Sequence, residues 1–532
     1  MTFTVNEICQ KIWQLEEKYE LNHKEIQDCY PWQLIRMYLY YEITRKLNIF
    51  ESAQQSSLSL SDKIKSFLPF IKNSLLSNPL SNKSKADVLI FDHPRKVLFQ
   101  NEYQDIYSYF LKGILNENKL SFETIEAPYL NQHFRNKENI KENHVKFNDR
   151  ILLGSFIHKT RNRGKLNFTD DEREFIEKIK NELASIFSIE IDLFRIIEDH
   201  ILNFQYEYKK YIELLEIKKP KFLFLVVAYE NKALVAACKK SNVEIIELQH
   251  GTISPYHLGY SYPENTRKSN NEIKEIEYFP DKILSFGDYW KGSSYFPIEK
   301  EKIIPIGFPY FEENSREFLE ISNNEKDKNE ILFISQGVIG KYLSKMAYEL
   351  AERIENKNKN KNKDQNDSNN TYKIIYKLHP GEYENWKENY EYLNRATNEF
   401  DNFKVIDNNR VPLYELFARS NYQIGAFSTA IYEGLAFNCR TFIIDVPGIE
   451  YLEDLIEKDI VKKVKNSEEL LDYITEEKEN KEKKEKKEKK EEKEEIYEKE
   501  EIYEKEEEKT IFKEYNKDYF FKNFNKDFLK SL

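Results

Sequence analysis

The sequence predicts an α/β protein with two Rossmann-like domains facing a cleft, behind a helical N-terminal extension. From about residue 86, short apolar runs alternate with polar loops and helical patterns; residues 222–248, for example, have the pattern of strand, helix and strand. The same alternation restarts at residue 331 after a polar stretch. Strands that alternate with helices form parallel sheets with right-handed crossovers, so each series predicts one doubly wound domain.

The boundaries of these parts follow from changes in sequence pattern. Apolar residues at helical spacing, such as Ile8, Ile12 and Leu15, predict helices near the N-terminus. An Asn/Lys-rich insert is expected to be a disordered surface loop, and a Glu/Lys run to be a solvated helix or disordered. The predicted organisation is a helical N-terminal extension at 1–85, an acceptor domain at 86–312, a linker at 313–330, a donor-nucleotide domain at 331–475 with its insert at 356–370, the Glu/Lys segment at 476–509 and an aromatic C-terminal helix at 510–532.

Composition excludes several classes of protein. With 532 residues, 40% of them hydrophobic, the chain can bury sizeable cores. A net charge of −11 gives no basic excess for nucleic-acid binding. The four cysteines are far apart, so they indicate neither a zinc site nor a disulfide framework. The first residues are charged too early for a signal peptide, and the apolar run 222–228 is too short to cross a bilayer. We expect a cytoplasmic protein, with attachment to the inner face of the membrane left open.

Polar residues follow the expected strands of the second domain, where doubly wound sheets bind ligands. Gln336-Gly337 would let backbone N–H groups approach a phosphate at a helix start, although a simple turn is the commoner reading. His379-Pro380 can donate to a phosphate oxygen or merely cap a turn. Ser428-Thr429 can hold phosphate or cap a helix, and Glu433, four residues after Thr429, can accept ribose hydroxyls. Together these loops predict a nucleotide-sugar site.

The first domain offers candidates for acid–base chemistry. A transferase needs a general base near the acceptor hydroxyl, and either His250 or Glu230 could serve. A metal site is only weakly indicated, because no carboxylate or cysteine completes a ligand set with the histidines, and a structural role for each histidine stays open. The other residues expected on the acceptor side are His93, Arg95, His257 and Tyr260.

The motifs ELQHGTISPYHLGY, FGDYW, IGFPYF, ISQG, KLHPGE and FSTAIYEGLAF resemble those of bacterial surface and capsular polysaccharide glycosyltransferases of the two-domain GT-B type. The likeness covers roughly residues 86–450. It is strongest to capsule-synthesis Kdo transferases and bacterial sialyltransferases, and more distant to CDP-glycerol glycerophosphotransferases. The resemblance implies a GT-B-like fold with the donor on the second domain and the acceptor on the first.

The resemblance also implies roles for individual residues. His379-Pro380 matches the His-Pro pair that contacts the phosphate of a CMP-sugar, Ser428-Thr429 matches the family's Ser/Thr pair, and Glu433 matches a ribose-binding glutamate. The acidic motif that supplies the base in sialyltransferases is not evident, because the sequence after residues 222–228 reads AYEN.

The expected function is transfer of a sugar from a nucleotide-activated donor, CMP-activated on this resemblance, to a glycan or glycolipid acceptor. The transfer would be inverting and would need neither metal nor cofactor. Contact with the membrane or with a polysaccharide-assembly complex is left open, and binding of nucleic acid is not expected. Three alternatives stay open: a CDP-polyol phosphotransferase, a non-catalytic component that binds nucleotide sugar or glycan, and a sugar-nucleotide epimerase, whose chemistry uses the same two-domain architecture.

Overall fold

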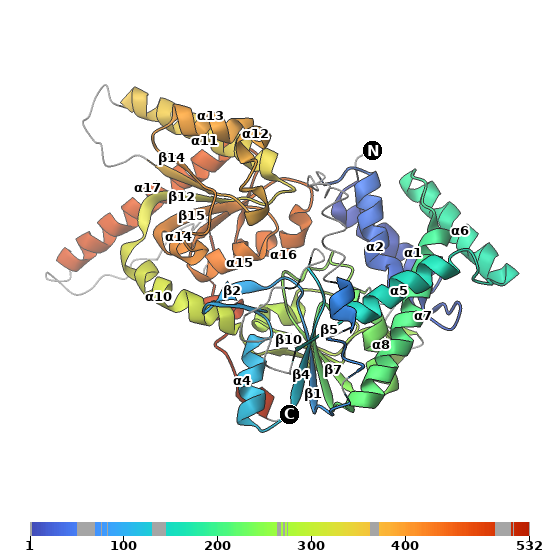
Figure 1. The fold of residues 1–532 in the computed structure, drawn as a ribbon. Coiled ribbons are helices and arrows are strands. Elements are labelled where there is room, and N and C mark those ends of the chain that lie inside the picture. The colour runs from blue at the N-terminus through green and yellow to red at the C-terminus, as the bar shows by residue number, and fades with distance from the viewer. Residues whose placement is uncertain are drawn as a thin grey trace. The chain divides into compact units, whose positions relative to one another are not determined.

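The computed structural model describes residues 3–50, 70–75, 77–81, 83–129, 133, 145–262, 268–269, 272–273, 275–361, 372–494, 512–513 and 515–530. The chain divides into two compact units (Figure 1). Unit 1 contains residues 1–313 and 518–532, and unit 2 contains residues 314–517.

Unit 1 is built on a seven-stranded sheet in which every pair of neighbouring strands is parallel. Strands such as β6, with the sequence FLFLV, are almost continuously apolar because helices cover both faces of a parallel sheet. The spatial order is β11-β10-β7-β6-β1-β4-β5. The bounds are β1 Val88–Asp92, β4 Phe122–Glu126, β5 Val145–Phe147, β6 Phe222–Val226, β7 Glu244–Leu248, β10 Lys282–Ser285 and β11 Ile303–Pro305.

Helices lie on the two faces of this sheet (Figure 1). Helix α4 packs its apolar side on β1, β6 and β7, and Phe524 and Phe528 of the C-terminal segment pack beside it. On the other face α7 contacts α5 and α8. Short antiparallel pairs join β2 (Val97–Phe99) to β3 (Glu102–Gln104) and β8 (Lys268–Ser269) to β9 (Glu272–Ile273). The helices are α4 Tyr109–Glu117, α5 Asp149–Asn162, α6 Asp170–Phe187, α7 Leu193–Lys218, α8 Lys232–Lys240 and α18 Asp527–Lys530.

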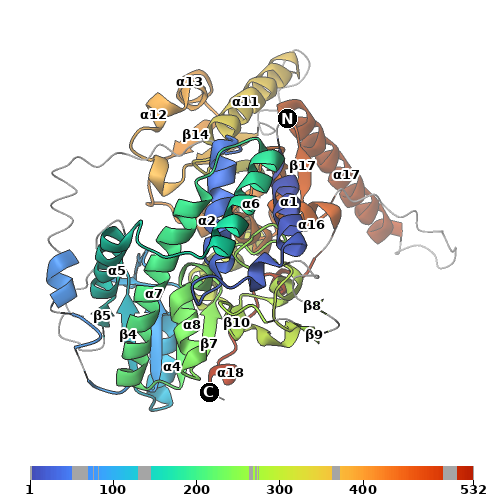
Figure 2. The same ribbon diagram turned by 90° about the vertical axis from the view of Figure 1, so that its right-hand side faces the viewer.

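The predicted N-terminal helices are present and belong to unit 1. Helix α1 (Val5–Lys18) begins with a capping box in which Thr4 and Glu7 bond each other's backbone N–H groups. Helix α2 (Pro31–Lys46) begins at a proline, which suits the first helical position. Figure 2 shows both helices beside α6 and α7, and Lys18 of α1 pairs with Glu182 of α6 at 2.8 Å.

Unit 2 contains a second parallel sheet, in the order β14-β13-β12-β15-β16-β17. Its strands are β12 Asp327–Ile334, β13 Lys373–Lys377, β14 Phe403–Ile406, β15 Ser420–Gly425, β16 Arg440–Ile444 and β17 Lys462–Val464. Its helices are α10 Pro309–Glu325, which begins in unit 1, α11 Gly340–Lys361, α12 Trp386–Asn389, α13 Glu391–Glu399, α14 Leu413–Arg419, α15 Thr429–Ala436, α16 Glu453–Glu457 and α17 Ser467–Glu494. The predicted α/β class with two parallel-sheet domains is therefore confirmed.

The connections differ from the sequence-based expectation in two places. The stretch 313–330, expected to be a linker, contains most of α10 and the start of β12, because its polar composition hides a helical spacing of apolar residues. The segment expected to form an aromatic C-terminal helix is helical, among its described residues, only at the 3₁₀ turn Lys517–Tyr519 and at α18. Phe520 and Phe521 are buried in unit 1, and Trp290 Nε1 donates to the Phe520 carbonyl at 2.9 Å. Residues 362–370 of the insert and 495–509 of the Glu/Lys segment lie outside the described residues.

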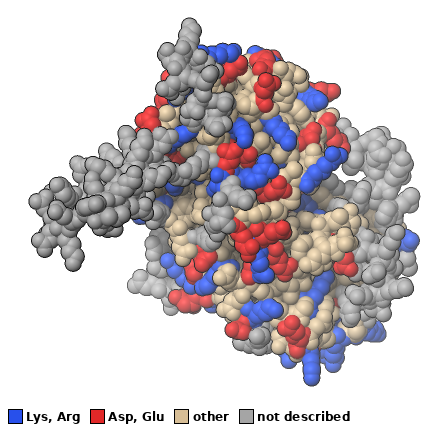
Figure 3. All heavy atoms as spheres, turned by 90° about the vertical axis from the view of Figure 1, so that its left-hand side faces the viewer, with Lys and Arg blue, Asp and Glu red and all other residues tan. Residues whose placement is uncertain are grey.

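Acidic and basic side chains are mixed on one face of the described surface (Figure 3). Over the described residues of the face drawn in Figure 3, basic and acidic side chains are interspersed rather than gathered into a basic stripe. Across the described part of the chain, no helix combines the length and apolar character that a bilayer crossing requires.

Candidate functional site

Each sheet reverses its strand order once, and the predicted residues follow the strands at those reversals. In unit 1, successive strands are added on one side of β1 until β5, and from β6 onward they are added on its other side. In unit 2, the strands from β12 to β14 lie on one side, and those from β15 onward lie on the other side of β12. The unit 2 order is the doubly wound pattern 3-2-1-4-5-6, and the unit 1 order is the same pattern with β11 added as a seventh strand at one edge. In this pattern ligands bind beyond the carboxyl ends of the strands at the reversal. The two switch points are therefore the candidate sites.

The unit 1 switch point brings an aromatic and imidazole cluster together. His93 follows β1, Tyr229 follows β6, and His250 follows β7. The rings of His93 and His250 stack with centroids 6.1 Å apart, and Tyr229 lies 6.1 Å from His250 and 5.1 Å from His257. Tyr260 completes the cluster, with its ring 4.9 Å from His257. Four of the predicted acceptor-side residues thus share one site.

The histidines of this cluster are neutral near pH 7. Burial and two neighbouring imidazoles lower the pKa of His250 to about 3, and burial lowers the pKa of His257 to about 4. Burial also lowers the pKa of His93. The Nδ1 atom of His250 is buried and has no hydrogen-bond partner among the described residues. In the tautomer that carries its proton on Nε2, this nitrogen can accept a hydrogen bond.

Glu247 is a member of this site that the sequence reasoning missed. Its Oε1 atom accepts hydrogen bonds from the Tyr260 hydroxyl at 2.7 Å and from the Ala228 N–H at 3.1 Å. Oε2 is buried without a partner among the described residues, and burial raises the pKa of Glu247 to about 7. Glu247 therefore joins the loops after β6 and β7. The available signal was an acidic residue inside the apolar run EIIEL.

The backbone is strained where β6 ends. Val227 adopts φ 66° and ψ 65°, a left-handed conformation that is a true outlier for a β-branched residue. The kink starts the short 3₁₀ turn Ala228–Glu230 and is held by the bond from Ala228 N to Glu247. Such strain costs on the order of 1–3 kcal/mol and clusters at functional sites. Glu230, placed at the end of this turn, is exposed, and partial desolvation raises the pKa of its carboxyl.

Buried charges support the loop that carries His93. Lys96 lies 2.6 Å from Asp92 and 3.3 Å from Glu126. Asp105 accepts hydrogen bonds from the backbone N–H groups of His93 and Tyr107, at 2.9 and 3.0 Å. The side chain of Arg95 is exposed, and its backbone N–H donates to His93 Nδ1 at 3.2 Å. Arg95 is thus joined to the cluster through its backbone.

The N-terminal helices fix the loop that carries His257. Arg36 of α2 is fully buried and pairs with Glu16 of α1 at 2.9 Å. It donates to the carbonyl of Ser261 at 3.1 Å and to that of Leu258, and its guanidinium lies 3.9 Å from the centre of the Tyr262 ring. Helices α1 and α2 are therefore a structural part of the candidate site.

In unit 2, two predicted loops are joined by hydrogen bonds. Glu382 accepts from Ser335 Oγ at 3.0 Å and from the backbone N–H of His379 at 2.7 Å. His379 is exposed, and its Nδ1 accepts from Gly381 N at 3.1 Å, so its Nε2 carries the proton in the neutral ring. Pro380 sets the first position of the 3₁₀ turn after His379. Glu382 was not predicted.

The β12 and β15 loops flank the reversal of this sheet. A Cβ placed on Gly337 would meet no heavy atom within 4 Å, and the Oε1 of Gln336 is buried with no partner among the described residues. After β15, Ser428 caps α15 by accepting from Ala430 N at 3.3 Å. Thr429 is the first residue of that helix. The positive end of α15 therefore lies at the switch point, where an anion is favoured.

Glu433 lies one turn into α15 and is partly buried. Burial raises its pKa to about 7, and the Tyr414 hydroxyl lies 3.5 Å from its Oε1 atom. At that pKa the carboxyl exists in both protonation states near neutral pH, so it can donate to or accept from a diol. The structure brings every predicted donor residue to the carboxyl edge of the sheet or to the helix after β15.

Metal ligands and disulfides are not found in the described chain. Among these residues, no group of three or more His, Cys, Asp or Glu side chains could hold a metal ion. All four cysteines are buried free thiols.

Of three comparisons with known proteins, only the comparison with solved structures finds matches. No protein-family model matches the sequence, and no curated protein matches it. The chain is similar to UDP-GlcNAc 2-epimerase from Methanocaldococcus jannaschii, with 11% identity, 73% of this chain and 91% of that chain covered, and a TM-score of 0.40. The chain is also similar to UDP-GlcNAc 2-epimerase from Neisseria meningitidis bound to UDP-GlcNAc, with 12% identity, 73% of this chain and 90% of that chain covered, and a TM-score of 0.40. A third similar structure is the wall teichoic acid polymerase TagF, with 11% identity, 77% of this chain and 87% of that chain covered, and a TM-score of 0.34.

Proposed function

We propose that the protein is a glycosyltransferase of cell-surface polysaccharide synthesis, which transfers a sugar from a nucleotide-activated donor to a glycan or glycolipid. The observation that supports it is the pair of switch points. Unit 2 offers an anion-binding helix end with hydroxyl, imidazole and carboxyl groups, and unit 1 offers uncharged imidazoles beside a carboxylate. The first set suits a nucleotide phosphate and ribose, and the second holds the candidate base His250 in a cluster that also contains the Glu247 carboxyl.

In unit 2 the donor would bind through its nucleotide. The N–H groups at the start of α15, the hydroxyls of Ser428 and Thr429 and the Nε2–H of His379 would donate to phosphate oxygens. The Glu433 carboxyl would hydrogen-bond the ribose hydroxyls. A CMP-sugar is the proposed donor, because His379-Pro380 and Ser428-Thr429 match the pairs of the CMP-sugar transferases. These groups stabilise the charge that develops on the leaving phosphate.

In unit 1, His250 would act as the general base. As the acceptor oxygen attacks the anomeric carbon, its proton passes to the imidazole, and the bond from that carbon to the phosphate oxygen breaks. The nucleotide monophosphate leaves with both bonding electrons, and attack from the opposite face inverts the anomeric configuration. His250 is favoured over Glu230 because its unpartnered Nδ1 lies inside the cluster, whereas Glu230 is exposed.

The test is a turnover assay with CMP-, UDP- and GDP-sugars and CDP-glycerol, each with and without a glycan acceptor. The proposal expects sugar transfer with release of CMP, lost in both His250→Asn and His379→Ala. Phosphorus retained in the polymer would mean polyol-phosphate transfer instead. Conversion of the nucleotide sugar without acceptor would indicate an epimerase, and binding without turnover across the panel a non-catalytic component.

A further inference from the structure

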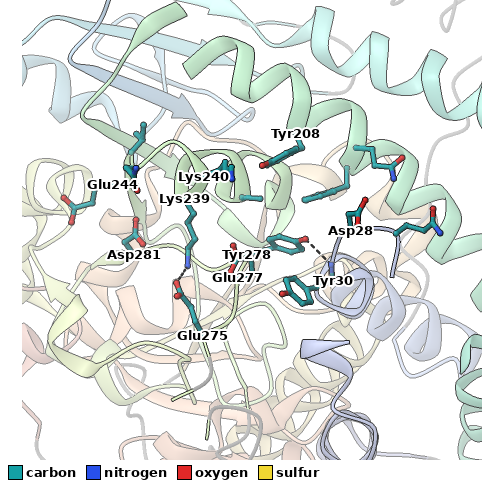
Figure 4. A pocket seen from close by; sticks show the side chains of 16 residues that line it. Asp28, Tyr30, Tyr208, Lys239, Lys240, Glu244, Glu275, Glu277, Tyr278 and Asp281 are labelled. Atoms are coloured by element: carbon teal, nitrogen blue, oxygen red, sulfur yellow. Dashed lines mark hydrogen bonds and ion pairs between the residues drawn. The ribbon is translucent and has the colours of Figure 1, made fainter. Parts of the chain in front are cut away.

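A large open cavity lies at the opposite end of the unit 1 sheet from the imidazole cluster (Figure 4). Its volume is about 880 Å³, and its walls come from the turn before α2, from α7 and α8, and from the segments that lead into β7 and β10. Glu244, the first residue of β7, lines it, whereas His250 follows the other end of that strand. At about 3.3 Å per residue, the cavity lies roughly 20 Å from His250.

One side of the cavity is backed by a run of aromatic rings, in which Tyr30 and Tyr208 are half-buried and Phe204 and Tyr278 are buried between them. Tyr30 lies 5.9 Å from Tyr278, which lies 5.0 Å from Phe204, and Phe204 stacks on Tyr208 at 5.6 Å with an interplanar angle of 13°. Phe204 and Tyr208 are four residues apart on α7 and therefore share one face of that helix. The Tyr30 backbone N–H donates to the Tyr278 hydroxyl at 3.1 Å, which ties the turn before α2 to this wall.

The polar lining is acidic. Five carboxylates line the cavity against the two ammonium groups of Lys239 and Lys240. Three of the five carboxylates are already partnered: Glu275 pairs with Lys239, Glu244 pairs with Lys282 at 2.5 Å, and Asp281 accepts from Ile245 N at 2.9 Å. The carboxylates of Asp28 and Glu277 make no hydrogen bond or ion pair with the described residues, so their oxygens can accept hydrogen bonds from a ligand.

This lining selects a class of ligand. An excess of carboxylates repels phosphate- and carboxylate-bearing chains. Aromatic faces pack against the C–H faces of sugar rings, and carboxylate oxygens accept from sugar hydroxyls. The volume also lies within the range of ordinary ligand sites, which combine aromatic walls with a few polar groups.

We propose that this cavity is a binding site for an uncharged, hydroxyl-rich oligosaccharide. The ligand class follows from the lining alone. That the bound saccharide is a neutral stretch of the acceptor chain, distal to its growing end, rests on the function proposed above: a site roughly 20 Å from the base would hold such a stretch while the end is extended. Holding the chain there would raise the effective concentration of its reactive end.

The test is saturation-transfer NMR of the full-length protein with maltohexaose, chitotetraose and an α2,8-linked sialic acid tetramer. At about 10 mM ligand, sites with Kd near 1 mM are occupied. We expect saturation of a neutral oligosaccharide and none of the anionic tetramer. Tyr208→Ala should weaken binding at least about tenfold, which equals about 1.4 kcal/mol of ring packing. Tyr342→Ala, which removes a tyrosine that is 53% exposed on α11, is the matched control and should change nothing.

Two further variants separate this proposal from failed folding and from the catalytic proposal. Tyr208→Phe keeps the ring and should keep most of the binding, so loss in Tyr208→Ala with an unchanged melting temperature would report the ring itself. His250→Asn should abolish transfer and leave saccharide binding intact. The proposal is overturned if no neutral probe is saturated, if the sialic acid tetramer binds best, or if Tyr208→Ala binds like the wild type.

Discussion

The buried pair between Arg36 and Glu16 should be essential to unit 1, and Arg36→Met tests this. The side chains are 1% and 0% exposed, so neither charge has access to water. Methionine keeps an unbranched apolar stem but leaves Glu16 as a buried carboxylate with only the Trp32 Nε1–H, at 2.8 Å, as a donor. Breaking a buried pair in this way costs about 3–5 kcal/mol. The carbonyl of Ser261 also loses its guanidinium donor, which lowers the stability of unit 1 further.

The assay is differential scanning calorimetry of the full chain, in which the unit 1 transition should fall by roughly 8 °C, at about 2 °C per kcal/mol for a unit of this size. Arg45→Met is the matched control: it lies on the same helix, its pair with Glu42 is 67% exposed on the arginine side, and it should cost less than about 1 kcal/mol. Glu16→Gln combined with Arg36→Met should recover part of the loss, because the uncompensated charge is gone. A fall of less than 2 °C in Arg36→Met would refute the reasoning, since about 1 kcal/mol is what an exposed pair is worth.

Three further predictions concern single side chains. Burial places the pKa of Glu247 at about 7, above its ordinary 4.5, so the stability that its protonated form contributes is complete below about pH 4.5 and is lost as pH rises through about 7. The stability of Glu247→Gln relative to the wild type should therefore rise between about pH 5 and about pH 8, by at most a few kcal/mol. Urea unfolding of both proteins at each pH measures this, and a difference in unfolding free energy that does not change with pH would contradict it. Ser428→Ala removes the cap of α15 and should lower the stability of unit 2 by about 1 kcal/mol and weaken CMP binding in calorimetric titration. Glu382→Gln, which loosens the His379 loop, should raise the donor KM several-fold with less change in kcat, and an unchanged KM would remove Glu382 from the donor site.

The sequence predicts individual elements well where burial dictates the residues. The two strands expected within residues 222–248 are β6 (Phe222–Val226) and β7 (Glu244–Leu248). The sequence of β6 is wholly apolar because a strand covered on both faces is buried, and β7 keeps an apolar run between its two glutamates. The order of the strands was not predictable in the same way, since β1 pairs with β6 more than 130 residues further along the chain. Local patterns carry no information on such pairings.

In the candidate site, too, some residues could be predicted from local sequence and others could not. Residues such as His250, His379 and Ser428 could be named because polar groups follow each apolar run, where a ligand binds. Arg36 and Glu247 could not, because their roles depend on contacts with distant loops: Arg36 bonds a carbonyl 225 residues away. The acid–base and donor roles assigned to the predicted residues remain predictions until they are measured.

The central claim is that a nucleotide binds at the switch point of the unit 2 sheet, and hydrogen exchange with and without CMP tests it most directly. The account predicts slower exchange in residues 335–340, 379–383 and 426–432, where the loops after β12, β13 and β15 present their N–H groups, and predicts that His379→Ala weakens the effect. Unchanged exchange in all three loops at saturating CMP, or slowing confined to other segments, would contradict it.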